Sequence, residues 1–578
     1  MHHLALCPQC GICTDIIFRH ERVVALFGND DSTSYRGQTR PFLFPDVELT
    51  ITTVDGFLLC RYPNCKRCAA SPHFIPVHYE CFNIIRQCCI ESIDALDRLW
   101  TAAAWRRARP IYLLGDRPDT NSLKALAQAC QLPQLCQLPL ELLGIIQGYS
   151  EHALLWRAIS AHSLAARISS TSPEPLFAMS LSDILFWKRG GKLETRSDAP
   201  LLPMTSMRLT IDSDGISKIE RTSDQPSKEV SHGSFAYIIE QEQTVAKFAA
   251  QLKDGLLRLV LPRGQPTPRI WNTPNPPDLS LCTPYISAYP SWQRFFAVDT
   301  GRIAGITFFF SLGRLFGIHT HYSNTSDAMP TYHHFSHRRR RGIVWVYQPI
   351  TEHDRLLVLG VRESSHGELS VLIRTERTGD VVIGSYVLGP ARNQCLGWRP
   401  PITLIYNEPI EGQGISFLGT YCGLSSKMEL PKPFVVQKVR SHPLGECAYF
   451  SRAPLANVAS AEVFYDESNQ FCRGIMFRYR DGSCRAVGQC RVHVDATKRI
   501  SQPLQFCYRI DTCDHGRQVV HSLQVALEEG PLHQHSEGWS CHRLDGDAEL
   551  LVYARLVIYS YGKLSENISI HSGPFSDL

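Results

Sequence analysis

Residues 472–491 read CRGIMFRYRDGSCRAVGQCR, and this stretch shows how the larger part of the chain is built. Two runs in which apolar and polar residues alternate flank the pair Asp481-Gly482. Alternation with a period of two is typical of a half-buried strand, and Asp-Gly is a strong signal for a tight turn between two strands. The stretch therefore predicts a β-hairpin.

Similar hairpins are expected at four other places, namely residues 207–221, 302–321, 368–386 and 402–421. An isolated hairpin is marginally stable in water, so repeated hairpins must bury their apolar faces against one another. Phe308, Ile373 and Phe477 hold comparable positions in three of the repeats, and we expect all three side chains to be buried. The predicted product is an all-β region that resembles a propeller, a prism or a sandwich.

Length and composition fit an ordinary globular protein. The chain has 578 residues, of which 44% are apolar and 20% charged, and a net charge of +4. This length suggests about three to four domains, and the small net charge gives no reason to expect a nucleic-acid partner. The chain begins MHHLALCPQCG, unlike a signal peptide, and no run reaches the ~18 apolar residues that a bilayer requires. These features predict an intracellular protein, cytoplasmic or nuclear, without a membrane partner.

The residue composition and the spacing of apolar residues change along the chain, and these changes predict four domains. The sequence predicts a multidomain α+β architecture, with a cysteine-rich head, a helical segment and a large C-terminal β region. The segment between the last two contains strands and ends in the proline-dense stretch 263–280. The predicted domains are the head at 1–110, the helical segment at 111–175, the β-containing connector at 176–280 and the repeat-built β domain at 281–578.

Cysteines concentrate in the head. Nine of the 21 cysteines fall within the first 89 residues. In a reducing compartment, clustered cysteines bind metal more often than they form disulfides. Three close ligand pairs occur, and a tetrahedral zinc site usually consists of two such pairs. The candidate ligands are Cys7 with Cys10, Cys65 with Cys68, and His78 with Cys81.

Three pairs suffice for one complete zinc site and half of a second. Cys13 and Cys60 are candidates to complete the second site, and so is His73. Sequence alone leaves the pairing open, and reduced cysteines packed in a small core are the alternative. We expect structural zinc, which would contribute its binding energy to the folding of the head.

Residues 137–168 carry two apolar helical faces in succession, and their opening resembles the F-box. The F-box is a short helical module whose opening reads LP-x-E-LL-x-x-I, and Glu141 holds its acidic position. The resemblance implies docking on the linker subunit of a cullin-type ubiquitin ligase. The apolar positions that would make this contact are Leu138, Pro139, Leu142, Leu143 and Ile146.

The second half of this segment departs from the F-box pattern. It lacks the usual Cys-Arg-x-Trp ending and carries Trp156-Arg157 earlier. A plain helical hairpin is the alternative, in which the same leucines would face the protein's own core. The whole chain also resembles a group of uncharacterised filamentous-fungal proteins, through the box His78–Phe82, the stretch ALDRLW (95–100) and the hairpin at 472–491.

Other motifs indicate less. Gly313, His319 and His321 match the opening of a cupin metal motif, but the glutamate that should follow is missing, so plain strand histidines are expected. Arg338–Arg341 is a dense basic run, for which a solvated loop is the expected structure. The sequence contains no G-x-x-x-x-G-K-[ST], G-x-S-x-G or H-E-x-x-H motif.

The preferred interpretation is therefore an F-box-like adaptor without catalytic residues, whose β region recognises a target. A freestanding lectin-like or protein-binding β module, with a glycan as a possible ligand, is the first alternative. An enzyme of unfamiliar type is the second.

Overall fold

The structure is a computed structural model, and the chain divides into two compact units. Unit 1 comprises Met1–Pro276 with Gln293–Phe295, and unit 2 comprises Pro277–Trp292 with Phe296–Leu578. The described residues are 3–29, 31–45, 52–61, 65, 67–68, 73–89, 94–106, 113, 119–150, 153–196, 206–222, 235–262, 267–287, 294–322, 326–335, 337–386, 390–409, 413–422, 431–435, 449–467, 472–512, 518–524, 537–553, 556–563 and 566–570.

Two small sheets and two helices form the head of unit 1. In one sheet the strand order is β1-β6-β5, and in the other β2 lies between β3 and β4 and also pairs with β7. β2 and β7 consist mainly of apolar residues and are almost entirely buried. Trp100 and Phe82 from the helices fill the core beside them. The elements are β1 (His3–Ala5), β2 (Arg22–Gly28), β3 (Tyr35–Gln38), β4 (Phe42–Leu43), β5 (Thr52–Val54), β6 (Phe57–Cys60), β7 (Phe74–His78), α1 (Tyr79–Cys88) and α2 (Ala95–Trp105).

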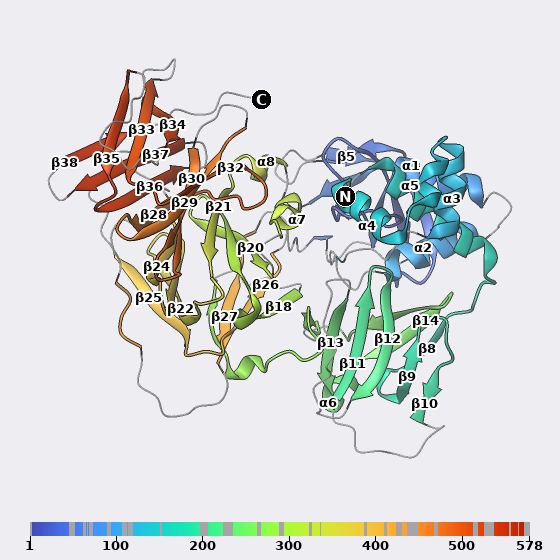
Figure 1. Ribbon diagram of the computed structural model, residues 1–578. Coiled ribbons are helices and arrows are strands. Elements are labelled where there is room, and N and C mark those ends of the chain that lie inside the picture. The colour runs from blue at the N-terminus through green and yellow to red at the C-terminus, as the bar shows by residue number, and fades with distance from the viewer. Residues whose placement is uncertain are drawn as a thin grey trace. The chain divides into compact units, whose positions relative to one another are not determined.

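The helical segment follows as α3 (Thr120–Ala129), the 3₁₀ turn η2 (Pro133–Gln137), α4 (Leu140–Tyr149) and α5 (Leu154–Ser170), and Figure 1 shows these helices gathered with α1 and α2. Asp119 caps α3 by accepting a hydrogen bond from the Ser122 amide at 2.9 Å. The N-terminal half of α5 packs against α3 and α4, and its C-terminal half belongs to the core of the head. The head and the helical segment therefore share α5.

The rest of unit 1 is β-structure. Its larger sheet contains the predicted hairpin 207–221 as β11 and β12, in the order β10-β9-β12-β11-β13-β16, and its smaller sheet has the order β15-β14-β8. Apolar side chains between the two sheets, such as Trp187 and Ile219, form a separate core. The elements are β8 (Phe177–Ser180), η3 (Leu181–Asp183), β9 (Ile184–Lys188), β10 (Glu194–Thr195), β11 (Ser206–Asp212), β12 (Gly215–Thr222), β13 (Ala236–Gln241), α6 (Glu242–Val245), β14 (Ala249–Lys253), β15 (Leu256–Val260) and β16 (Ile270–Trp271).

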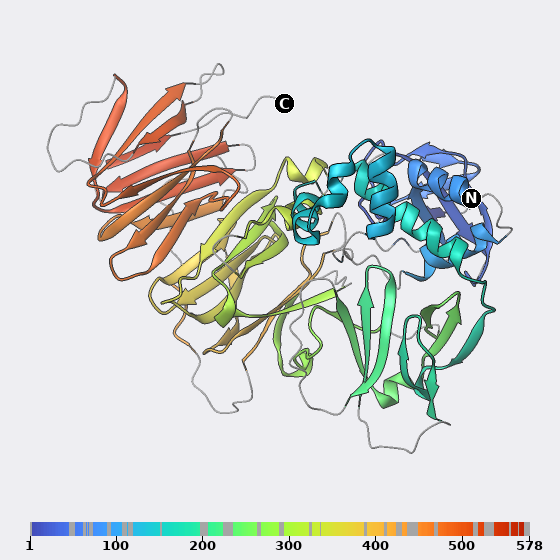
Figure 2. The ribbon, with the colours of Figure 1, turned by 45° about the vertical axis from the view of Figure 1, so that its right-hand side comes forward.

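Unit 2 is a succession of small, mainly antiparallel sheets, which Figure 2 shows from yellow-green to red. Their orders are β18-β26-β27-β17, β20-β19-β21, β24-β23-β22-β25, β31-β30-β29-β32, β34-β33-β35 and β28-β36-β37-β38. The first elements are η5 (Leu279–Leu281), β17 (Thr283–Ile286), β18 (Arg294–Asp299, whose first two residues belong to unit 1), η6 (Thr300–Arg302), β19 (Gly305–Ser311), β20 (Arg314–His321), α7 (Met329–His333), α8 (His337–Arg340), β21 (Val344–Pro349), β22 (Leu356–Ser364), β23 (Leu369–Thr375), β24 (Gly379–Gly384) and β25 (Ala391–Trp398). The later strands are β26 (Thr403–Asn407), β27 (Phe417–Tyr421), β28 (Tyr449–Pro454), β29 (Val458–Tyr465), β30 (Cys472–Tyr479), β31 (Cys484–Gly488), β32 (Ala496–Ser501), β33 (Gln505–Thr512), β34 (Gln518–Gln524), β35 (Trp539–Arg543), β36 (Asp547–Tyr553), β37 (Leu556–Lys563) and β38 (Glu566–Ile570).

The four hairpins predicted in the C-terminal region are present in unit 2. They are the antiparallel pairs β19–β20, β23–β24, β26–β27 and β30–β31. Phe308, Ile373 and Phe477 are buried, as the repeats predict. Each sheet is open in the described part of the chain, and a propeller is not confirmed.

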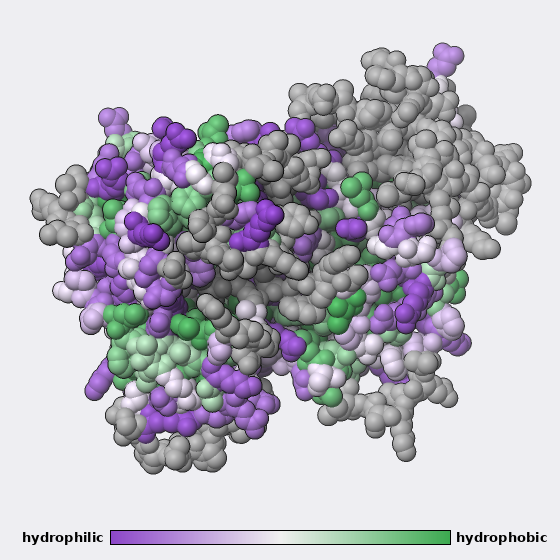
Figure 3. Space-filling view, turned by 180° about the vertical axis from the view of Figure 1, so that it is seen from behind, coloured by the Kyte–Doolittle hydropathy of each residue, from purple (hydrophilic) through white to green (hydrophobic). Residues whose placement is uncertain are grey.

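The described surface mixes polar and apolar areas (Figure 3). Among the described helices, none has the length and apolar character that a membrane crossing requires.

Candidate metal centres

Cys10, Cys13, His78 and Cys81 form one compact group in the head, here called the inner centre. One ligand atom from each residue lies within 4.8 Å of the other three, and all four residues are buried. Three thiols and an imidazole at this spacing match the donor set of a tetrahedral zinc site.

Local backbone geometry brings the inner ligands together. Cys10 and Cys13 lie on a tight turn in which Thr14 has a φ of 64° and its amide donates to the Cys10 carbonyl at 3.1 Å. The Ile12 and His78 amides each lie 3.4 Å from the Cys10 sulfur, as donors to it. His78 ends β7 and Cys81 lies in the first turn of α1, so a strand-to-helix junction supplies the second pair.

The ionisation of the inner cysteines is uneven. The pKa of Cys10 is held well below its usual range, because hydrogen bonds from Cys13 and Cys81 and the charge of His78 outweigh the effect of burial. Burial raises the pKa of Cys13, and the hydrogen bond to Cys10 raises the pKa of Cys81. Cys10 therefore ionises more readily than Cys13 and Cys81, and binding of a divalent metal would release the protons of the remaining thiols.

A carboxylate orients the histidine of the inner centre. The Nδ1 atom of His78 lies 3.4 Å from the Cys13 sulfur and 3.9 Å from the Cys81 sulfur. Its Nε2 atom lies 3.3 Å from Glu21 Oε2. A metal-binding histidine usually gives its second nitrogen to such a carboxylate, which fixes the tautomer and the ring orientation. This arrangement agrees with a metal on the Nδ1 side.

Glu21 also joins the inner centre to α5. Its Oε1 atom accepts a hydrogen bond from Arg157 at 2.7 Å, and Arg157 donates to Asp15 at 2.6 Å. Burial would raise the pKa of Glu21, but His78 and Arg157 outweigh it and lower the pKa to about 2. The carboxylate therefore stays charged between His78 of the inner centre and the helical segment.

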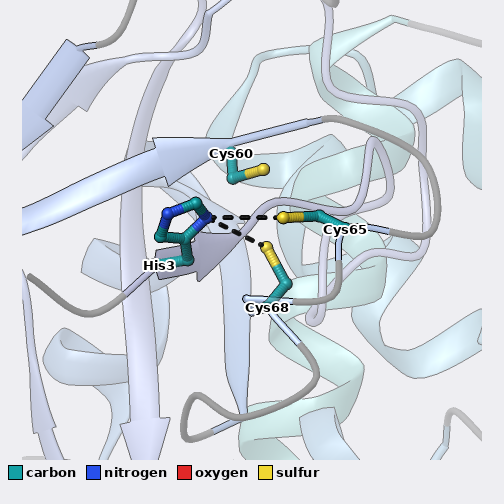
Figure 4. A group of neighbouring side chains, drawn as sticks. All are labelled: His3, Cys60, Cys65 and Cys68. Atoms are coloured by element: carbon teal, nitrogen blue, oxygen red, sulfur yellow. Dashed lines mark hydrogen bonds between the residues drawn. The ribbon is translucent and has the colours of Figure 1, made fainter.

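His3, Cys60, Cys65 and Cys68 form a second group, here called the outer centre, and Figure 4 shows their side chains pointing toward one another. Their ligand atoms also lie within 4.8 Å of one another. The Nδ1 atom of His3 lies 3.5 Å from the Cys65 sulfur and 3.7 Å from the Cys68 sulfur. Only His3 is buried, and the three cysteines are partly exposed.

Strand pairing positions half of the outer centre. β1 and β6 run parallel with Ala5 opposite Cys60, which brings His3 to the sheet that carries Cys60. The Cys68 amide holds the pKa of Cys65 below its ordinary value, and burial raises the pKa of Cys68. As in the inner centre, the cysteines of the outer centre differ in pKa, and Cys65 ionises more readily than Cys68.

The two centres bring together five of the six predicted ligands. Cys65 and Cys68 are joined by His3 and Cys60, and the pair His78 and Cys81 is joined by Cys10 and Cys13. Cys13 and Cys60 were expected as completing residues. His3 was not predicted, because it reaches its partners only through the β1–β6 pairing.

Two other head residues lie elsewhere. Cys7 belongs to neither group in the described part of the head. His73 contacts the Ser32 hydroxyl at 2.7 Å through Nδ1, and it too lies outside both groups.

The ligands of the two centres alternate along the chain. His3 belongs to the outer centre, and Cys10 and Cys13 belong to the inner centre. Further along the chain, Cys60, Cys65 and Cys68 return to the outer centre, and His78 and Cys81 return to the inner centre. Neither centre can therefore be assembled from one continuous segment.

The F-box-like residues divide between the interior and the surface. Leu143 is 2% exposed in the small core formed with Leu123, Trp156 and Ile159, and Leu138 packs partly buried against that core. Leu142, Ile145 and Ile146 of α4 are 45%, 54% and 37% exposed, and Pro139 is also exposed. Ile145 is not one of the predicted contact residues.

The histidines of the cupin-like motif are structural in the described residues. The Nε2 atom of His321 lies 2.8 Å from the Thr307 hydroxyl, and Nδ1 of His319 lies 2.8 Å from the Thr331 hydroxyl. Burial lowers the pKa of His319 to about 3, so this imidazole stays neutral. In the basic run, the Arg339 guanidinium lies 4.1 Å from the centre of the Phe316 ring.

No protein-family model matches the chain, and no curated protein matches it.

Proposed function

We propose that this protein is an F-box-like adaptor, in which a zinc-stabilised head holds a helical docking segment and the β-rich units recognise a target. The partner proposed for the docking segment is the linker subunit of a cullin-type ubiquitin ligase. The observation that carries the proposal is the exposed apolar face of α4.

This face consists of Leu142, Ile145 and Ile146, three large apolar side chains at spacings of three and four residues. Exposed large apolar side chains that gather on one helix mark an interaction site more often than scattered ones do. Leu143 points into the core behind them, so α4 is anchored while its outer stripe is available. Such a stripe suits recognition of a helix by an apolar groove.

Zinc is the metal proposed for both centres. Each offers three cysteine sulfurs and one histidine nitrogen, the soft donor set that zinc favours in closed four-ligand sites. Four protein ligands leave no open coordination position, so the proposed role is structural. The bound metals would supply part of the folding free energy of the head.

The docking segment depends on this head through α5. Arg157 connects α5 to Glu21 beside the inner centre, and the adjacent Trp156 lies in the core that supports α4. A metal-bound head would thus fix the orientation of the exposed face.

The test is a pull-down of the ligase linker subunit with the full chain and with a Leu142→Ala, Ile146→Ala double variant. The variant should lose linker binding while its melting temperature stays close to that of the wild type, because both residues lie on the exposed face of α4 and outside its buried core. The matched control is Leu143→Ala, which should lower stability by about 2–5 kcal/mol, as a buried leucine does.

A wild-type chain that binds no linker subunit in a direct assay would refute the ligase role. The alternative would then be a freestanding β-recognition protein, for which a cavity in unit 2 is the favourable observation.

A further inference from the structure

Unit 2 contains a cavity of about 280 Å³, where β24 meets β28 and β31. This volume equals about nine water molecules at roughly 30 Å³ each. It lies near the lower end of the range for small-molecule sites. Its lining includes Asp380, Ser385, Tyr386, Phe450, Arg452 and Arg485.

The charge of this lining is predominantly positive. Arg485 donates to the backbone carbonyls of Arg452 and Thr378, and burial lowers its pKa. The acidic lining residue Asp380 is already engaged, because Arg374 binds both of its carboxylate oxygens and the Val435 amide donates to it. Arg362, which also lines the cavity, donates to the Asn393 side chain at 3.4 Å, and Arg485 is the candidate to receive an anion.

Arg452 differs from Arg485 because acids already surround it. It forms an ion pair with Asp547 and lies 3.6 Å from Glu549. Two acids thus contact Arg452 directly, whereas the hydrogen bonds described for Arg485 go to neutral carbonyls and Asp547 and Asp380 act on it only through space.

The cavity also has a polar and an aromatic wall. The Ser385 hydroxyl is buried and has no hydrogen-bond partner in the described part of the chain. An unpaired buried hydroxyl costs free energy, which a ligand oxygen or nitrogen would recover. The rings of Tyr386 and Phe450 lie 6.1 Å apart at 65° and offer an apolar surface to a ring.

We propose that this cavity binds a small carboxylic acid built on a ring, of monosaccharide size, such as a hexuronate. Arg485 receives the carboxylate, Ser385 bonds a polar substituent, and Tyr386 and Phe450 contact the ring. Guanidinium suits a carboxylate because its planar N–H groups match the two oxygens. This site is independent of α4 and of both metal centres.

The test is calorimetric titration of the full chain with D-glucuronate, benzoate and D-glucose. An affinity for glucuronate at least tenfold higher than the affinity for glucose supports the proposal and identifies the ligand as an acidic sugar. Binding of benzoate with weak glucuronate binding supports the carboxylate site and identifies an aromatic acid. Equal binding of glucose and glucuronate, or no binding of either acid, overturns it.

Variants establish the place of binding. Arg485→Gln should weaken acid binding about tenfold or more, since it removes a charge-assisted hydrogen bond. Tyr386→Ala, which keeps Arg485 and its backbone contacts, should weaken binding several-fold and guards against a folding defect in the first variant. The matched control is Arg302→Gln at an exposed arginine outside the cavity. If the control weakens binding as much as Arg485→Gln does, the site assignment is wrong.

Discussion

Cys7 and Cys13 differ in one respect that decides their roles: Cys13 lies among the inner ligands and Cys7 does not. Cys7 and Cys13 each lie three residues from Cys10, so the sequence makes both plausible partners of Cys10. The turn at Thr14 brings Cys13 back to Cys10, and local sequence patterns do not encode that turn strongly. The ligand types were therefore predictable, whereas one pairing was not.

The two proposed centres would hold two zinc ions per chain. We expect Cys13→Ser to lower the zinc content by about one ion, because it deletes a proposed ligand of the inner centre. Cys7→Ser is the matched control and should leave the metal content unchanged. Metal analysis of the purified full-length variants measures both. Equal zinc loss in the two variants would contradict the assignment of the inner centre.

Asp214 connects three parts of unit 1 at a single side chain. It lies at the turn between β11 and β12, 2.5 Å from Arg106 after α2 and 2.9 Å from Arg167 of α5. Burial would raise the pKa of Asp214, but the two arginines outweigh it and lower the pKa to about 2. The charged form is thus the one that stabilises the fold.

Asp214→Asn should lower the stability of unit 1 at pH 7 by about 2 kcal/mol or more, since each unit of pKa shift corresponds to about 1.4 kcal/mol. The folded pKa lies below the ordinary value of 3.8, so this stability is present above pH 3.8 and lost as pH falls toward 2. Denaturant unfolding at several pH values measures it. A difference between wild type and variant that stays constant down to pH 2 would contradict the role of Asp214.

At the scale of elements, the hairpins could be predicted from the sequence, but the strands that pair with each hairpin in its sheet could not. Alternating side chains and a turn such as Asp481-Gly482 are local signals, and β30 and β31 form where they occur. The pairing of β30 with β29, or of β28 with β36 nearly a hundred residues later, depends on contacts between distant segments. Sheet order therefore stayed open among a propeller, a prism and a sandwich.

The buried position of Phe477 in β30 predicts how much this side chain contributes to the stability of unit 2. Phe477→Ala should destabilise unit 2 by roughly 3–5 kcal/mol, as for other buried aromatic residues. Arg478→Ala, at the exposed position next to Phe477 in the same strand, is the matched control and should change stability by less than about 0.5 kcal/mol. Thermal unfolding of both variants compares them. A Phe477→Ala variant as stable as its control would show that this core contributes little.

At the scale of the whole molecule, both metal centres belong to unit 1, and unit 2 has cores of its own. A chelator should therefore unfold the head and the helical segment while the β-sheets of unit 2 persist. Limited proteolysis with and without chelator measures this, with digestion expected to begin in unit 1. Simultaneous digestion of both units would contradict independent stability, and an unchanged pattern would contradict a structural metal.

The alternation of ligands along the head has a consequence for chain connectivity. Because each centre takes ligands from both sides of the interval between Cys13 and Cys60, a single backbone cleavage there would leave two fragments bridged twice by metal. Metal coordination would act as a reversible cross-link, as a disulfide does in an oxidising compartment. A nicked head would remain associated while its metals are bound, and chelation would allow its two pieces to separate.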